Sequence, residues 1–233
     1  MEYKRTLNNF VLIKLDRENT SVKLKNGIEL YLDTSFEPEK HATITGTIYG
    51  LPSHLIYTGK PNLGMPWLTP MEIEFGDKVI IYYLSVVNAL RKEKENYFLE
   101  GGDRYIMIEY QYIFAVVRED KIIPINGYVL VEPIEDPALE KEKLRMAFIG
   151  MKAVFFKKKT QTQVTYGIVK YVGVPNREYA DENLTDEGVD IGIGDTVVLR
   201  RTVDIPLQYE LHATVDKGKG LLRVQRRNVL AKI

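Results

Sequence analysis

The chain has 233 residues, with 32 basic and 32 acidic side chains, 45% hydrophobic residues and no cysteine. This length suits either one large all-β domain or two domains of just over about 100 residues each, and the hydrophobic fraction is sufficient for a core. The absence of cysteine excludes disulfide frameworks, cysteine nucleophiles, thiolate zinc sites and iron–sulfur clusters. Zero net charge argues against a protein that mainly coats nucleic acid, because that affinity comes mostly from phosphate neutralisation.

Short segments rich in Val, Ile, Tyr and Phe recur along the chain and are separated by Gly, Pro and Asp, which is the pattern of strands and turns. In chain order, we expect strands at residues 10–15, 43–49, 78–84, 105–108, 113–117, 128–131, 164–171, 196–200 and 221–224. Helical periodicity is scarce. The best helix candidate is residues 138–148, acidic at its start and basic towards its end, and a charged loop fits that segment equally well. The sequence therefore predicts an all-β protein.

The first residues are charged, and the apolar stretch after them is interrupted by Lys14 and Asp16. This pattern is neither a signal peptide nor a transmembrane span, which needs about 20 apolar residues. We therefore expect a cytoplasmic protein with no membrane contact.

Four strand motifs occur twice, in the same order and about 118 residues apart, which is the signature of an internal repeat. The pairs are Val11-Leu12-Ile13-Lys14 with Val129-Leu130-Val131-Glu132, Thr45-Gly46-Thr47-Ile48 with Tyr166-Gly167-Ile168-Val169, Phe75-Gly76-Asp77-Lys78 with Ile193-Gly194-Asp195-Thr196, and Tyr112-Ile113-Phe114-Ala115 with Asn228-Val229-Leu230-Ala231. We predict two copies of one unit, residues 1–120 and residues 121–233.

Each copy enters an apolar strand through a Gly-Asp pair, Gly76-Asp77 and Gly194-Asp195. Glycine adopts a positive φ without a steric penalty, and aspartate can hydrogen-bond its own backbone in a tight turn. Any small β-structure needs such turns, so the pair taken alone is also explained by ordinary turn chemistry.

The order of these features in both copies resembles the GroES-like co-chaperonin family. The resemblance implies two tandem GroES-like β-barrels with long loops. It also implies a first strand leading into a mobile loop, whose Gly and short apolar triplet dock on a GroEL-type chaperonin. In the first copy, Gly27-Ile28-Glu29-Leu30 stands at the position of that motif.

Simple energetics are compatible with such a loop. Burying Ile28 or Leu30 is worth roughly 1.5–3 kcal/mol each, and several identical loops on a ring would add avidity. Glu29 departs from an apolar triplet and would be unfavourable in an apolar groove unless it faces water. An ordinary edge strand after a turn also explains residues 27–32.

The second copy repeats the strands well and the loop poorly. Between Pro133 and Val164 lies a longer segment with an apolar cluster, in which Met151, Val154 and Phe155 are possible second-loop contacts. A basic run follows this cluster. Together with Arg223, Arg226 and Arg227 it suggests nucleic acid, but the balanced charge and the scarcity of neighbouring aromatic residues favour a solvated face.

Signals of catalysis are weak throughout the chain. The three histidines, His41, His54 and His212, are far apart and have no metal-ligand spacing, so we expect no metal site. Gly218-Lys219-Gly220 lacks the remaining features of a phosphate loop and suits a hairpin tip. Trp67 lies in a segment rich in Pro and Gly, and we interpret it as a local hydrophobic plug. We expect no enzyme activity and no cofactor.

The sequence as a whole favours a co-chaperonin that caps a GroEL-type chaperonin ring and is itself a homo-oligomeric ring. The alternative is a non-catalytic structural or adaptor protein that keeps the fold and has lost chaperonin docking. Glu29 and the irregular second loop favour this alternative.

Overall fold

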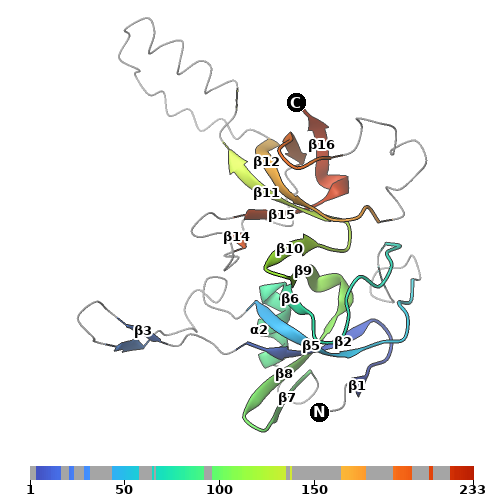
Figure 1. Ribbon diagram of the computed structural model, residues 1–233, viewed down its shortest axis with the longest axis vertical. Coiled ribbons are helices and arrows are strands. Elements are labelled where there is room, and N and C mark those ends of the chain that lie inside the picture. Colours follow the sequence, from blue (N-terminus) through green and yellow to red (C-terminus); the bar gives the residue numbers. More distant parts are fainter. Residues whose placement is uncertain are drawn as a thin grey trace, which may run out of the picture. The chain divides into compact units, whose positions relative to one another are not determined.

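The computed structural model describes residues 4–16, 21–23, 29–31, 44–57, 65, 67–91, 96–134, 137, 164–176, 191–200, 210–211 and 221–233 (Figure 1). The chain divides into two compact units. The first comprises residues 1–126 with 176–178, and the second comprises residues 127–175 with 179–233.

The first unit is built on a mainly antiparallel sheet with the strand order β10-β9-β6-β5-β2-β8-β7, to which β1 adds a parallel pairing with β5. A separate hairpin, β3-β4, interrupts the connection from β2 to β5. The elements are β1 (Lys4–Arg5), β2 (Phe10–Leu15), β3 (Ser21–Lys23), β4 (Glu29–Tyr31), β5 (Thr45–Leu51), β6 (Lys78–Ile81), α2 (Tyr83–Arg91), β7 (Tyr97–Glu100), β8 (Asp103–Glu109), the 3₁₀ turn η1 (Tyr110–Tyr112), β9 (Ile113–Arg118) and β10 (Lys121–Pro124).

The second unit contains one antiparallel sheet with the order β14-β15-β11-β12-β13-β16. Its elements are β11 (Tyr128–Ile134), β12 (Val164–Val172), β13 (Thr196–Arg200), β14 (Glu210–Leu211), β15 (Leu221–Gln225), the 3₁₀ turn η2 (Arg226–Asn228) and β16 (Val229–Lys232). This order matches β7-β8-β2-β5-β6-β9 of the first unit strand for strand. The repeated sequence motifs therefore occupy equivalent places in two sheets of one topology.

The Gly-Asp turns show how closely the two units correspond. Gly76 and Gly194 have φ values of 86° and 92°, the left-handed region that glycine tolerates. Gly76 N–H donates to the Ile48 carbonyl at 3.0 Å, and Gly194 N–H donates to the Val169 carbonyl at 2.8 Å. The aspartate side chain closes each turn by accepting from a backbone N–H three residues earlier, at 2.7 Å for Asp77 and 2.6 Å for Asp195.

The hydrophobic core of each unit is made by side chains of its sheet, and β2 and β11 bury consecutive residues. In the first unit, Val11, Ile13, Ile48, Val79 and Ile106 are fully buried. In the second unit the core consists of Val129, Val131, Val169, Val197, Leu199, Leu222 and Val224. The all-β class predicted from sequence is confirmed. The described strands form open sheets, however, and not closed barrels.

The helix α2 is an element that the sequence pattern did not predict. The segment was expected to continue a strand to residue 84, but β6 ends at Ile81 and the helix begins at Tyr83. Val86 and Ala89, three residues apart, are its buried positions, so one face of α2 packs on the unit. The aromatic and β-branched residues at its start are typical of strands. The helical periodicity was therefore not recognised in the sequence. The helix expected at residues 138–148 lies outside the described residues.

Two glycines allow the close approach of the first two strands of each sheet. A Cβ atom on Gly46 would lie 2.6 Å from Ile13 Cγ2 and 2.6 Å from the Lys14 carbonyl oxygen. A Cβ atom on Gly167 would overlap Val131 Cγ1 and lie 3.0 Å from the Glu132 carbonyl oxygen. Neither neighbour is the flexible end of a long side chain, so the strands themselves would have to move apart.

We predict that Gly167→Ala destabilises the protein by about 1–3 kcal/mol, because overpacking forces a shift in the sheet. The matched control is Gly192→Ala in the same unit, where the added Cβ would meet Asp195 at an ordinary 3.4 Å. Denaturant unfolding followed by circular dichroism measures both effects. Equal stability of the two variants would show that the close contact at Gly167 does not make the sheet sensitive to an added Cβ.

Candidate functional site

The expected docking loop lies between β2 and β5, and the structure describes part of it as a hairpin. β3 and β4 pair antiparallel, with Val22 opposite Leu30 and Lys23 opposite Glu29. Glu29 and Leu30 therefore belong to a strand and not to an isolated extended arm. Gly27 and Ile28 lie outside the described residues, so their role as docking residues stays a prediction.

The base of this loop is closed by Asp16 and Thr45, the residues at which it leaves and rejoins the sheet. Asp16 N–H donates to the Thr45 carbonyl at 3.1 Å, and the Thr45 hydroxyl donates to the Asp16 carboxylate at 2.6 Å. Lys78 Nζ lies 3.3 Å from the same carboxylate. Because both ends of the loop are joined to each other, the loop is an insertion that leaves the sheet intact.

The second unit carries an insertion at the equivalent place, between β11 and β12. The paired strands extend to the loop base, where Ile134 is opposite Tyr166. Lys170 Nζ lies 2.7 Å from the Glu132 carboxylate further along the same strand pair. Met151, Val154 and Phe155 lie outside the described residues, and their contacts stay predictions.

A buried polar network in the first unit, centred on Tyr110, was not visible in the sequence. Glu72 N–H donates to the Tyr110 hydroxyl at 2.9 Å, and that hydroxyl donates to the Pro70 carbonyl at 3.4 Å. The Glu72 carboxylate accepts from the Thr69 hydroxyl at 3.2 Å and from Asn126 N–H at 2.7 Å. Burial raises the pKa of Glu72 and of Tyr110 above their usual ranges. The network fastens the Pro-rich segment to the sheet, which is a structural role.

Trp67, in this same segment, is buried, in agreement with its interpretation as a local plug. A tyrosine that follows a strand carries no distinctive sequence signal. The network is recognised only in the structure, where the short 3₁₀ turn η1 places Tyr110 against the Pro-rich segment.

The described residues contain no group of three or more His, Asp or Glu side chains placed to hold a metal ion. His54 is exposed, and its Nδ1 lies 2.9 Å from the Ser53 hydroxyl. His41 and His212 lie outside the described residues. Within the described residues, no helix has the length and apolarity needed to cross a bilayer.

No protein-family model and no curated protein matches this chain.

The aspartates of the Gly-Asp turns are held in their charged form by cations from β9 in the first unit and from β16 in the second. Arg118 donates to Asp77 at 2.6 Å and 2.9 Å, and Lys232 Nζ lies 2.9 Å from Asp195. Burial opposes ionisation of Asp77, but the Arg118 and backbone hydrogen bonds outweigh it and lower its pKa. The hydrogen bond from Lys232 is the main cause that lowers the pKa of Asp195.

We predict that Asp77→Asn lowers the melting temperature at pH 7 and that the difference from wild type shrinks in acid. A carboxyl group whose pKa is lowered by folding stabilises the protein above its unfolded pKa of about 3.9, and this stabilisation is lost as the pH falls through the lower folded value. Melting curves from pH 7 to pH 2.5 test this. Asp120→Asn, at a turn position with a φ of 59° that asparagine tolerates, is the control and should show no such trend. A constant difference across the pH range would contradict the prediction.

Proposed function

We propose that this chain is a co-chaperonin, the subunit of a lid that caps a GroEL-type chaperonin ring and assists ATP-dependent protein folding. One observation carries the proposal. Two units that share a six-strand order occur in tandem, and each has a long insertion at the same place, between β2 and β5 or between β11 and β12. This arrangement supports two GroES-like units, each presenting a docking loop. The proposed activity involves no catalysis and no cofactor.

The chaperonin-binding residues in this proposal are Gly27, Ile28, Glu29 and Leu30, with Met151, Val154 and Phe155 as possible contacts of the second loop. The closed base at Asp16 and Thr45 supports this role because it holds both ends of the first loop at one point of the sheet. Binding by one such loop is weak, since ordering the loop opposes it. Several loops acting together overcome this weakness by avidity.

A lid needs several copies of the chain, and the junction between β9 and β11 suggests how copies join. β10 covers the outer edge of β9, with Ile122 opposite Val117 and Pro124 opposite Ala115. Ile125 N–H then donates to the Phe114 carbonyl at 2.9 Å. Ile125 and Phe114 are only 1% and 2% exposed. This edge of β9 is therefore sealed by the segment that leads into the second unit.

Residues 3–8, which lead into β2, are the repeat equivalent of residues 121–126, which lead into β11. Asn8 and Asn126 both adopt a positive φ, 56° and 59°. Leu7 takes the place of Ile125, yet it is 80% exposed. Leu7 is therefore an exposed apolar side chain, whereas its equivalent, Ile125, is buried against the edge of β9.

β16 is the repeat equivalent of β9, and its surface is correspondingly uncovered. Leu230 takes the place of Phe114 and is 47% exposed, and Ala231 and Lys232 are also exposed. In the part of the chain that the structure describes, β16 pairs only with β13. An unpaired edge of this kind is a template for strand addition.

The exposed Leu7 and the uncovered edge of β16 are complementary. In the proposed assembly, residues 4–8 of one copy cover β16 of the next copy, as residues 121–126 cover β9 within the chain. The contact uses the edge of β1 that is not paired with β5. Such a contact joins unlike surfaces and generates a ring when its rotation closes. This contact supports the homo-oligomeric ring that a lid requires.

We expect the wild-type chain to be oligomeric and Leu7→Asp to dissociate it, because the substitution places a charge at the proposed contact. Leu7 is so exposed that Asp should leave the folded unit unchanged. Leu99→Asp, at a 63% exposed position on β7, is the matched control and should stay assembled. Native mass spectrometry measures the assembly state, and circular dichroism checks folding. A monomeric wild type, or an oligomeric Leu7→Asp variant, would refute this mode of assembly.

Docking is tested separately by mixing the protein with a GroEL-type chaperonin and ATP and measuring co-elution and ATPase inhibition. We expect Ile28→Asp and Leu30→Asp to weaken binding more than about tenfold, since each removes a buried apolar anchor. Glu29→Val should strengthen binding, because it restores an apolar triplet. Leu99→Asp again serves as control. Failure of the wild type to bind any chaperonin, including that of its own source, would refute the lid function.

A second candidate function is a non-catalytic structural or adaptor protein that has lost chaperonin docking. The pairing of Glu29 and Leu30 with Lys23 and Val22 in the β3–β4 hairpin favours it, because a strand already paired on one side is less free to fold onto a partner. An assembled wild type that fails to bind chaperonin would favour this second function.

A further inference from the structure

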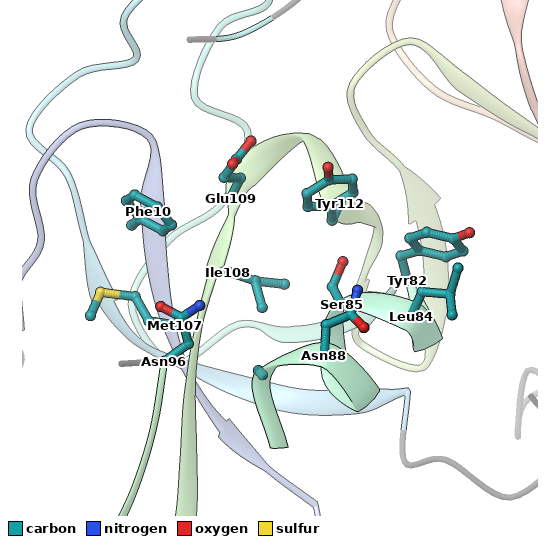
Figure 2. Close-up of a pocket in the computed structure, with 11 residues that line it drawn as sticks. Phe10, Tyr82, Leu84, Ser85, Asn88, Asn96, Met107, Ile108, Glu109 and Tyr112 are labelled. Atoms are coloured by element: carbon teal, nitrogen blue, oxygen red, sulfur yellow. The ribbon is translucent and has the colours of Figure 1, made fainter. Parts of the chain in front are cut away.

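The first unit contains a surface hollow of about 300 Å³ beside α2 that the lid function does not use. Figure 2 shows Phe10 and Met107 on one side and Tyr82 and Tyr112 on the other, with Ser85 and Asn88 of α2 between them. Ile108 projects into the space between these walls. A hollow of this volume is at the lower end of the range for small-molecule sites.

The polar lining of the hollow offers several hydrogen-bond acceptors, on hydroxyl and carboxamide groups that also donate, and it contains one negative charge. The acceptors are the Ser85 hydroxyl, the carboxamide oxygens of Asn88 and Asn96, and the Glu109 carboxylate at the rim. No Lys, Arg or His is among the described lining residues. Glu109 accepts a hydrogen bond from Gln111 Nε2 through one oxygen, which leaves capacity on its second oxygen.

The aromatic wall of the hollow is held in place by its neighbours. The Tyr82 and Tyr112 ring centroids are 6.0 Å apart with an interplanar angle of 30°, and Tyr82 also contacts Phe114 at 5.9 Å. Tyr82 N–H donates to the Tyr112 carbonyl at 2.9 Å, which links the start of α2 to η1. A wall fixed in this way loses little conformational entropy when a ligand binds.

The second unit shows that the fold does not require these side chains. By the strand pairing, Met107, Glu109 and Tyr112 correspond to Arg223, Gln225 and Asn228. Tyr82, which follows β6, corresponds to Arg200 at the end of β13. The same framework positions therefore carry an acidic and aromatic set in one unit and a basic and amide set in the other.

We propose that the hollow binds a guanidinium group. A guanidinium has five N–H donors and no acceptor, which matches a lining that offers several acceptors and has one carboxylate at its rim. Its flat face stacks on aromatic rings, which Phe10, Tyr82 and Tyr112 provide. The group can belong to a free guanidino compound or to an arginine side chain of a peptide segment. Both present the same chemistry to the hollow.

The test is calorimetric titration of the full chain with three probes. These are agmatine, Nα-acetylarginine N-methylamide, and the neutral citrulline analogue of the latter, which has the same shape. We expect saturable binding of at least one guanidinium probe with a dissociation constant of about 1 mM or tighter, and at least about tenfold weaker binding of the citrulline analogue. Tighter binding of agmatine indicates a free compound as the natural ligand, and tighter binding of the arginine amide indicates a peptide segment.

Two variants locate the binding. Glu109→Gln removes the charge and keeps the shape, and it should weaken binding at least about tenfold. Ser85→Leu fills the hollow from α2 and should abolish binding. Glu74→Gln, an exposed glutamate outside the hollow, is the matched control and should bind as wild type. Absence of binding by both guanidinium probes, equal binding of the citrulline analogue, or unchanged binding by the Glu109→Gln variant would overturn the proposal.

Discussion

The close contact of the first two strands in each sheet is the constraint on which the rest of the structure depends. Gly46 lies opposite Leu15, and Gly167 lies opposite Pro133, at the end of the strand pair where each insertion begins. A register shift between Leu12 and Ile13, and between Leu130 and Val131, bends the first strand just before this contact. Because these glycines present no side chain, the strands approach closely although a long insertion connects them.

The next elements are positioned by this strand pair. The Gly-Asp turn is hydrogen-bonded to Ile48 in one unit and to Val169 in the other, so it brings β6 or β13 alongside the second strand. The cation from β9 or β16 then forms an ion pair with the turn aspartate. β9 and β16 thus take equivalent places, two strands away from the glycine contact. They differ in that β10 covers the outer edge of β9.

The parts of the fold that repeat in the sequence were predictable, because a strand core and a Gly-Asp turn impose the same residue types wherever they occur. Val11, Val129 and the two Gly-Asp pairs align by residue type and spacing alone. α2 could not be predicted, because its aromatic and β-branched start satisfies strand patterning and only tertiary packing decides between the two. The pairing of β10 with β9 was also missed, since residues 121–124 directly precede the second repeat and were assigned to it. In the structure they pack on the first unit.

The candidate sites were less accessible to sequence reasoning than the fold. The loop motif at Gly27-Ile28-Glu29-Leu30 could be proposed because its position follows from chain order. The hollow beside α2 could not, since its walls come from β2, α2, β8 and η1, and no two of these elements form a recognisable motif. Only a comparison of equivalent positions in the two repeats shows which residue types the fold requires and which it tolerates.

The same comparison indicates whether the two units have equivalent roles. Positions inside both sheets keep the same physical character, as Val79 and Val197 do, because packing allows little else. Positions around η1 and η2 differ in chemistry: Glu109 is a carboxylate where Gln225 is an amide, and Tyr112 is aromatic where Asn228 is an amide. If the units served only as equivalent segments of a lid, the same demands would act on both. Their different chemistry at equivalent positions instead favours two units that share a framework and differ in the groups they present.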